Sequence, residues 1–204
     1  ENDRTVIGNT TPKFQGGFGL SGQWKNFDFT ANFNYMVDFD VYNATNYMLS
    51  SSISNTNNFY NVLADFTQKN RWTYVRADGE CLYKNTNIDG SVNEYITMNA
   101  GKSLWNPADV EDKVTHSYFV EDGSFLRLQD VTIGYTLPSN LTKKWGMSKV
   151  RFYASASNLF ILTGYSGYDP EVDVQSGLTP SMDYNRYPRS RSFVFGTNIT
   201  SVSY

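Results

Sequence analysis

The sequence predicts an all-β fold, specifically a segment of an antiparallel transmembrane β-barrel with long extracellular loops. Three observations favour this class: long runs in which apolar and polar residues alternate, an aromatic content of 16%, and connections that are alternately short and long. Strict alternation places successive side chains on opposite faces of a strand. The chain of 204 residues is therefore expected to form strands with one apolar and one polar face.

Five runs share this design, at residues 14–24, 27–38, 125–137, 149–161 and 191–203. Only Lys25 and Asn26 separate the first two runs, which predicts a hairpin. Pro138 ends the third run, because proline cannot donate to a strand ladder. Long polar stretches follow Asp38 and Leu162. Short turns and long loops therefore alternate, as they do in outer-membrane barrels, where the long loops lie outside the cell.

The segment between residues 39 and 124 is too long to be a bare loop in a compact domain. Within residues 57–70, Tyr60, Leu63 and Phe66 recur at helical spacing, which predicts a short helix there. The chain has no run of about 18 apolar residues, so it is not expected to contain a transmembrane helix.

Alternation alone does not separate a lipid-facing strand from a β-sandwich strand, so other features must decide. The runs are near or beyond the roughly 9 to 11 residues that cross a bilayer at a tilt, and exceed the usual soluble strand of about 5 to 6. Aromatics such as Trp24, Phe27 and Tyr135 stand near strand ends, and the polar faces hold no large apolar residue beyond Met36 and Tyr153. These features favour a membrane barrel, with a secreted aromatic-rich β-sandwich as the alternative.

The alternation assigns individual residues to each face. The residues predicted to face lipid are Phe27, Phe29, Phe33, Tyr35, Val131, Ile133, Phe152, Phe193, Phe195 and Ile199. The residues predicted to face the lumen are Asp28, Asn32, Asn34, Asp130, Arg151 and Asn198. Five strands are too few to close around a lumen, and open edges in hydrocarbon cost several kcal/mol per unpaired group. The chain is therefore expected to be part of a larger barrel.

Composition bounds the function. A net charge of -3, with 17 scattered Lys and Arg, gives no basic field for nucleic acid. Cys81 and His116 are the single residues of their types, so neither a disulfide framework nor a histidine metal cluster is predicted. No nucleophile and base at recognisable spacing and no phosphate-binding loop is present, and an enzyme is not predicted.

A family resemblance rests on motifs at 123–128 (GSFLRL), 154–160 (ASASNLF), 167–171 (GYDPE) and 187–196 (YPRSRSFVFG). With weaker matches near the N-terminus, in DRTVIGNTTPKFQGGFG at 3–19, the chain resembles the C-terminal barrel segment of SusC/RagA-family TonB-dependent outer-membrane transporters of Bacteroidota. The combination and its order are specific, although no single motif is.

The resemblance implies the last roughly five strands of a barrel of about 22 strands in the bacterial outer membrane. It implies nutrient import, of glycans or oligopeptides, with a SusD-like surface lipoprotein and with energy coupling through TonB. The plug and the TonB box of such transporters are absent from these residues. A secreted carbohydrate-binding or adhesin module remains the alternative, and an autotransporter-like or assembly barrel would lack the GYDPE and GSFLRL series.

Several loop residues are candidates for contact with a ligand or a partner. They are Tyr165, Tyr168, Asp169, Glu171, Tyr184 and Tyr187. Asp169 and Glu171, together with Asp173, could also order a loop or hold calcium, although Asp before Pro is first of all a turn device. No other cofactor or metal is expected. Tyr204 is the candidate for the terminal aromatic that the barrel-assembly machinery reads, as the resemblance implies.

Overall fold

The computed structural model describes residues 5–50, 61–66, 70–71, 73–76, 81–82, 89, 91, 96–98, 102, 104–105, 115–172 and 180–201. The chain divides into two compact units, one of Glu1–Tyr42 with Val120–Tyr204 and one of Asn43–Phe119. The first unit contains the long strands, and the second contains the middle of the chain.

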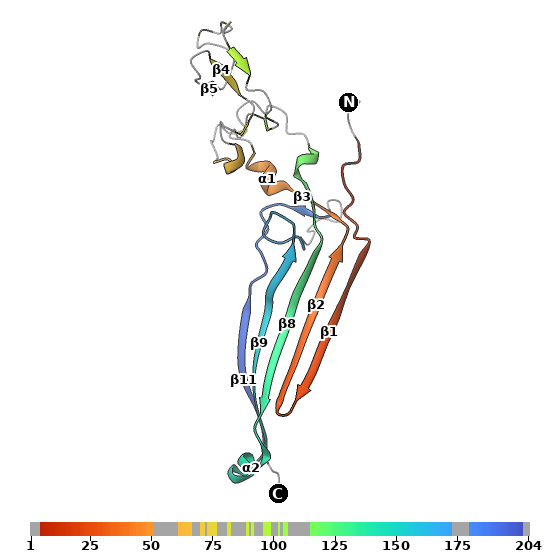
Figure 1. The fold of residues 1–204 in the computed structure, drawn as a ribbon, viewed down its shortest axis with the longest axis vertical. Helices are drawn as coiled ribbons and strands as arrows, with labels where there is room; N and C mark the ends of the chain where they lie inside the picture. The colour runs from red at the N-terminus through yellow and green to blue at the C-terminus, as the bar shows by residue number, and fades with distance from the viewer. Residues whose placement is uncertain are drawn as a thin grey trace. The chain divides into compact units, whose positions relative to one another are not determined.

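One antiparallel sheet of five strands dominates the first unit, in the order β1-β2-β8-β9-β11 (Figure 1). Its strands are β1 (Phe14–Trp24), β2 (Phe27–Val37), β8 (Phe125–Thr136), β9 (Met147–Thr163) and β11 (Ser192–Ser201). Each long strand pairs with the next long strand along the chain, and the predicted antiparallel all-β class is confirmed. The strands occupy the five alternating runs, with β9 extending beyond its run at both ends. Residues 202 and 203 of the last run lie outside the described residues.

The register explains why alternation produces two different faces. Phe18 of β1 pairs with Phe33 of β2, and their rings stack with centroids 4.8 Å apart. Phe27 pairs with Tyr135 of β8, and their tilted rings have centroids 4.6 Å apart. Because directly opposed side chains lie on the same face, apolar residues meet apolar residues from strand to strand. One face is therefore aromatic and aliphatic, and is called the apolar face here; the other is called the polar face.

A β-bulge interrupts this regularity in β8 and β9. Gln129 has no partner on β2, and Asn158, with a φ of 53°, lies in the matching irregular stretch of β9. An extra residue reverses the alternation on either side of it. Val131 therefore points to the apolar face, whereas Arg127, four residues earlier, points to the polar face beside Asn34.

The two ends of the sheet carry different connections. At one end, Lys25 and Asn26 join β1 to β2, and Lys25 adopts a φ of 53°. At the same end, α2 (Ser139–Thr142) and a 3-10 turn, η3 (Lys143–Trp145), join β8 to β9. This end is called the short-turn end. At the opposite end, called the long-loop end, the chain makes the long excursions after β2 and β9.

A small sheet and a hydrophobic core lie at the long-loop end. The sheet has the order β10-β3-β7 and consists of β10 (Met182–Asp183), β3 (Asp40–Asn43) and β7 (Val120–Asp122). Phe39, Val41, Phe125, Tyr165 and Val172 form the buried cluster. Phe125 projects from the polar face of β8. The cluster residues that follow β2 and β9 pack against it, so they cover this part of the polar face.

The expectation that the polar face holds no large apolar residue beyond Met36 and Tyr153 is wrong. Phe125, Ile161 and Val194 also lie on that face by register. Phe125 belongs to the buried cluster, and Met36 and Ile161 pack against it, so three of these polar-face residues have an internal partner. For Phe125 and Ile161 the bulge had concealed this arrangement, because the register shifts between Leu128 and Asp130.

The second unit contains α1 (Ala44–Met48), η1 (Ala64–Phe66), β4 (Tyr74–Arg76), β5 (Cys81–Leu82), β6 (Ile96–Met98) and η2 (Ser117–Phe119). Asn43 caps α1 by accepting a hydrogen bond from the Asn46 amide at 2.9 Å. Of the helix predicted within residues 57–70, the structure describes 61–66 and 70, and in these residues it shows only the single turn η1. None of the helices in the described ranges is both long and apolar enough to span a membrane.

Candidate functional site

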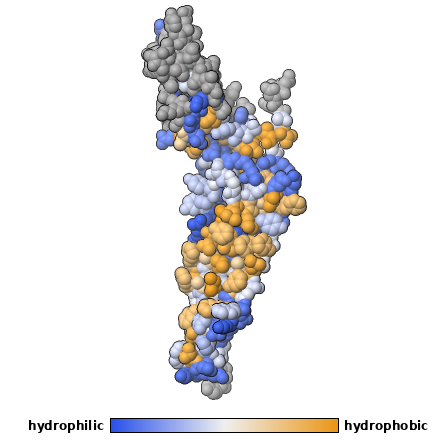
Figure 2. Space-filling model, viewed as in Figure 1, coloured by the Kyte–Doolittle hydropathy of each residue, from blue (hydrophilic) through white to orange (hydrophobic). Residues whose placement is uncertain are grey.

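The residues predicted to face lipid all lie on the apolar face of the sheet, which the strand register places together. Many of them are exposed: the exposed fraction is 80% for Phe195, 61% for Phe193 and 55% for Ile133. Figure 2 shows apolar residues gathered over the strands, with polar residues towards the short-turn end. A soluble monomer rarely leaves so continuous an apolar surface open to water. This face therefore requires an apolar environment.

The residues predicted to face the lumen lie together on the opposite, polar face. Arg151 of β9 reaches across β8 to Asp28 of β2, donating from Nε to Oδ2 at 2.9 Å and from Nη2 to Oδ1 at 2.5 Å. Gly134 of β8 makes this possible, because a Cβ there would collide with the Arg151 guanidinium. A bidentate pair thus fastens three strands on the polar face near the short-turn end.

Further polar contacts follow along the same face. Ser157 donates to Asp130 at 2.7 Å, and the Thr132 and Ser155 hydroxyls lie 2.6 Å apart. The Tyr153 ring lies over Gly196, where a Cβ would approach the ring within 2.5 Å. These side chains satisfy one another laterally, as expected of a wall that meets water or a polar filling.

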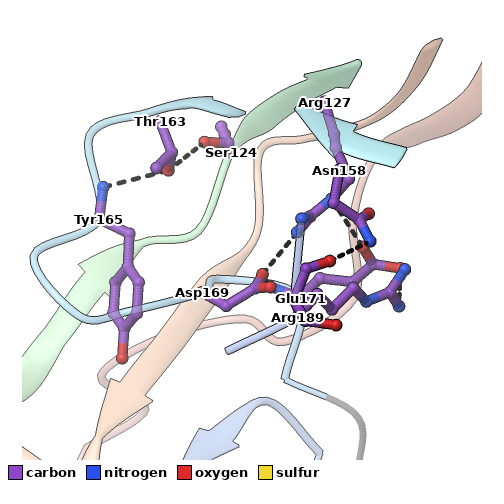
Figure 3. Close-up of polar contacts among 9 residues, drawn as sticks. Ser124, Arg127, Asn158, Thr163, Tyr165, Asp169, Glu171 and Arg189 are labelled. Carbon is purple, nitrogen blue, oxygen red and sulfur yellow. Dashed lines mark hydrogen bonds and ion pairs between the residues drawn. The ribbon is translucent and has the colours of Figure 1, made fainter. Parts of the chain in front are cut away.

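An ionic cluster, called the loop anchor, fixes the chain that follows β9 to the polar face of β8 (Figure 3). Arg127 Nη2 donates to Asp169 Oδ1 at 2.6 Å, and both residues are buried, with exposed fractions of 4% and 7%. Arg189 Nη2 donates to Glu171 Oε1 at 2.7 Å. Arg127 Nε lies 3.3 Å from Glu171 Oε2, and these two atoms pair by charge without a hydrogen bond among the described residues.

The loop anchor has its own local geometry. Asp169 Oδ1 also accepts a hydrogen bond from the Glu171 amide at 3.0 Å, which forms a turn around the buried Pro170. The Arg127 guanidinium stands 5.5 Å from the centre of the Phe125 ring. The motifs GSFLRL and GYDPE thus meet in space: the arginine of the first neutralises the aspartate of the second.

Tyr165 fastens the same loop at a second point. Its hydroxyl donates to Asp183 Oδ2 at 2.7 Å, and only 6% of the residue is exposed. Its amide donates to Thr163 Oγ1 at 3.1 Å, and that hydroxyl donates to the Ser124 carbonyl at 2.9 Å (Figure 3). Burial, followed by the hydrogen bond to Asp183, raises the pKa of the Tyr165 hydroxyl. The phenol therefore acts as a neutral donor in the interior.

These contacts revise the candidate loop residues. Tyr165 and Asp169 are buried and Glu171 is paired twice, so their partners are internal, which argues against ligand contact by Tyr165 and Asp169. Tyr168, Tyr184 and Tyr187 have exposed fractions of 78%, 61% and 88%, and their role as contacts stays a prediction. Tyr204 lies outside the described residues.

The calcium alternative receives no support from the part of the chain that the structure describes. No group of three histidine, cysteine or acidic side chains suited to a metal occurs there, and Asp173 lies outside it. Arginines already neutralise Asp169 and Glu171. Asp169 and Glu171 thus order the loop through ion pairs with arginine.

The sequence reasoning missed Arg127, Asp183 and Arg189. A signal for Arg127 was present: LRLQD breaks the alternation on the N-terminal side of Val131, and a charged residue in such a break marks a possible bulge. Arg189 and Asp183 are separated from their partners Glu171 and Tyr165 by 18 residues each, a distance that no local pattern covers.

A cavity of about 260 Å³ lies next to the loop anchor in the first unit. Its lining includes Gln15, Met36, Phe39, Glu171 and Arg189. Its lining holds the Arg189–Glu171 ion pair and five apolar residues, at the long-loop end of the polar face.

The sheet thus defines a class of protein: a β-barrel wall with one apolar face and one polar face. No protein-family model matches the chain. The chain is 32% identical over 203 residues to TonB-dependent receptor P3 of Formosa agariphila, covering 97% of this chain but 17% of that protein. It is 40% identical over 84 residues to TonB-dependent receptor SusC of Bacteroides thetaiotaomicron, covering 40% of this chain and 8% of that protein.

Solved structures agree on the fold. The RagAB peptide importer in its closed-closed state matches 95% of this chain with a TM-score of 0.65 at 22% identity, and the match covers 18% of that chain. The open-open state matches 93% with a TM-score of 0.62 at 24% identity, covering 17% of that chain. The chain spans less than a fifth of the length of these relatives. The chain belongs to the TonB-dependent receptors, which are outer-membrane proteins.

Proposed function

We propose that this chain forms part of the wall of an outer-membrane barrel that imports nutrients, with the apolar face against lipid and the polar face towards the lumen. The observation that carries the proposal is the presence of both faces on one sheet. Phe193 and Phe195 are exposed on one side, while Arg151 and Asp28 form a bidentate ion pair on the other. A soluble sandwich would instead cover its apolar face with a second sheet.

The edges of the sheet support a larger barrel. Among the described residues, β1 and β11 each pair on one side only. Unpaired backbone groups in hydrocarbon cost several kcal/mol each, so strands elsewhere in the complete protein would pair with both edges. A barrel of about 22 strands would place the polar face around a plugged lumen.

The finer assignment concerns cargo and partners. We propose that the complete protein takes up glycans or oligopeptides, catalyses no reaction, and works with a SusD-like surface lipoprotein and with TonB. Relatives named for SusC and TonB, and the fold shared with a peptide importer, support this assignment. In this chain, the cavity beside Glu171 and Arg189 and the exposed Tyr168, Tyr184 and Tyr187 are the groups available to cargo or lipoprotein.

A matched pair of substitutions tests the membrane assignment in the full-length protein. Phe33→Arg places a charge on the apolar face and should cost about 2 to 4 kcal/mol if the site lies near the bilayer midplane. Asn32→Arg places the same charge on the polar face and should be tolerated. The measurement is the amount of heat-modifiable, outer-membrane-assembled protein on detergent gels. Equal tolerance at both positions would refute the assignment of faces, and a water-soluble wild type would favour the secreted β-sandwich.

Cargo is tested separately, by growth and uptake of a deletion strain complemented with the full-length gene. Rescue on an oligosaccharide or on an oligopeptide would assign the class. A protein that assembles in the membrane yet rescues neither would overturn the cargo proposal while leaving the barrel assignment intact.

A further inference from the structure

The link between β8 and β9 exposes an apolar pair beside two cations. Leu141 of α2 and Trp145 of η3 are 44% and 59% exposed. They stand four positions apart on a helical segment, so they project to broadly similar sides. Lys143 and Lys144, also exposed, occupy the last turn, and neither α2 nor η3 has an acidic residue in its first turn. An exposed tryptophan beside lysines is the composition of a segment that lies at a membrane interface.

The link is held firmly against the sheet. Thr142 is completely buried, and the Leu137 amide donates to the Val150 carbonyl at 2.9 Å. The Thr136 amide donates to the Asn26 carbonyl at 2.8 Å, which places this link beside the β1–β2 turn. The exposed side chains of the link therefore have a fixed height relative to the strands.

The neighbouring turn repeats the same chemistry. Trp24 is 68% exposed, and the Lys25 ammonium stands 4.8 Å from the centre of its ring. Lys149 at the start of β9 lies on the polar face by register, and Asp28 on that face is paired with Arg151. The short-turn end is thus basic and aromatic where the apolar face ends.

The opposite end differs in charge. Its described carboxylates include Asp40, Glu121, Asp122, Asp169 and Asp183. Arg127 and Arg189 pair with Asp169 and Glu171 at that end, so an anionic headgroup would meet no excess of cations there, whereas Lys143 and Lys144 would attract it at the short-turn end. This difference in charge between the two ends favours the leaflet at the short-turn end and an anionic headgroup.

We propose that the β8–β9 link is a lipid anchor: Leu141 and Trp145 enter the headgroup region of the leaflet at the short-turn end, and Lys143 and Lys144 bind phosphates of anionic phospholipid. The proposal rests on the proposed function, because it needs the apolar face to be in lipid. It goes further by assigning a specific lipid contact to a connection between strands. Lysine stems can lie along apolar surface while their ammonium groups reach the phosphates.

Spin labelling of the full-length protein in nanodiscs of phosphatidylethanolamine and phosphatidylglycerol tests the depth. A label at Leu141→Cys, with Cys81 and other reactive cysteines replaced, should collide readily with oxygen and poorly with a water-soluble nickel chelate. A label at Asn140→Cys, one residue away and exposed, is the matched control and should meet the chelate more. Equal chelate access at both would overturn the anchor, and shielding of Leu141→Cys from both reagents would mean that a protein covers the link.

Headgroup charge is tested by native mass spectrometry of phosphatidylglycerol retained by the same protein. A lysine near an anionic surface strengthens binding about five-fold, so Lys143→Gln with Lys144→Gln should weaken retention by roughly 25-fold. Lys102→Gln, an exposed lysine outside the sheet, is the control. Unchanged retention in the double variant would overturn the lipid contact. A label at Phe195→Cys that oxygen cannot reach would instead refute the proposed function itself.

Discussion

Replacing Arg127 with methionine would leave the Asp169 carboxylate buried without its cation. Arg127 and Asp169 have side chains that are 4% and 9% exposed, and their N–O distance is 2.6 Å. After the substitution, the contact left to Asp169 Oδ1 would be the hydrogen bond from the Glu171 amide at 3.0 Å. The Glu171 side chain would keep its own cation, Arg189. Removing one partner of a buried ion pair costs about 3 to 5 kcal/mol, which is mainly the penalty of the remaining charge.

The loss should fall on the loop rather than on the sheet. The ladder of β8 with β2 and β9 does not depend on the Arg127 side chain, so the barrel should still assemble. Hydrogen exchange of amides in residues 164–172, measured on the full-length protein in detergent, should accelerate by about two to three and a half orders of magnitude. Amides in the middle of β8 should exchange as in the wild type.

Two comparisons make the prediction refutable. Arg127→Met combined with Asp169→Asn removes both charges and should recover much of the protection, giving a favourable coupling in a double-mutant cycle. Lys13→Met removes one partner of the Lys13–Asp38 pair, whose side chains are 63% and 56% exposed, and should change exchange little. If Arg127→Met behaves like Lys13→Met, or if the two substitutions at the anchor simply add, the reasoning about buried charge is wrong.

Two further predictions concern the polar contacts. Gly134→Val should displace the Arg151 guanidinium and break its pair with Asp28, lowering the thermal stability of the assembled barrel, whereas Gly164→Val, where a Cβ meets nothing within 4 Å, should have little effect. Because folding raises the pKa of Tyr165, protection of its loop should be constant below the unfolded pKa of about 10 and should fall above it, as the open form loses its proton first. Tyr165→Phe should remove this fall in protection above pH 10. It should also lower protection below pH 10, since the Asp183 carboxylate loses a buried donor. Unchanged alkaline sensitivity in Tyr165→Phe would assign it to another group.

Periodicity predicted the sheet well because each strand satisfies a local rule. In β2 the alternation from Phe27 to Val37 needs only the period of the backbone, and a two-residue turn fixes its register with β1. The position of Gln129 escaped prediction because a bulge is one residue wide and is specified by pairing with distant strands. The small sheet of β10, β3 and β7 escaped for the same reason, since its strands have two to four residues each.

The candidate site shows a different limit. Asp169 and Glu171 were identified as a carboxylate cluster, which is correct as composition, but composition does not say what neutralises the charge. The answer lies at Arg127, 42 residues from Asp169, and at Arg189, 18 residues from Glu171. Tyr165 was grouped with exposed loop tyrosines because nothing in SGY or TGY distinguishes a buried phenol from an exposed one. Its partner Asp183 had to be brought near by the fold.

The bulge at Gln129 links the two-faced sheet to the loop anchor. On the C-terminal side of it, odd-numbered residues of β8 such as Val131 and Ile133 point to the apolar face. Without the extra residue, Arg127 would continue that series and carry its charge towards lipid, at a cost of up to about 4 kcal/mol near the midplane. With it, Arg127 turns to the polar face and meets Asp169. One inserted residue thus keeps a cation off the apolar face and gives the loop its buried counter-ion, so GSFLRL and GYDPE act as one structural unit.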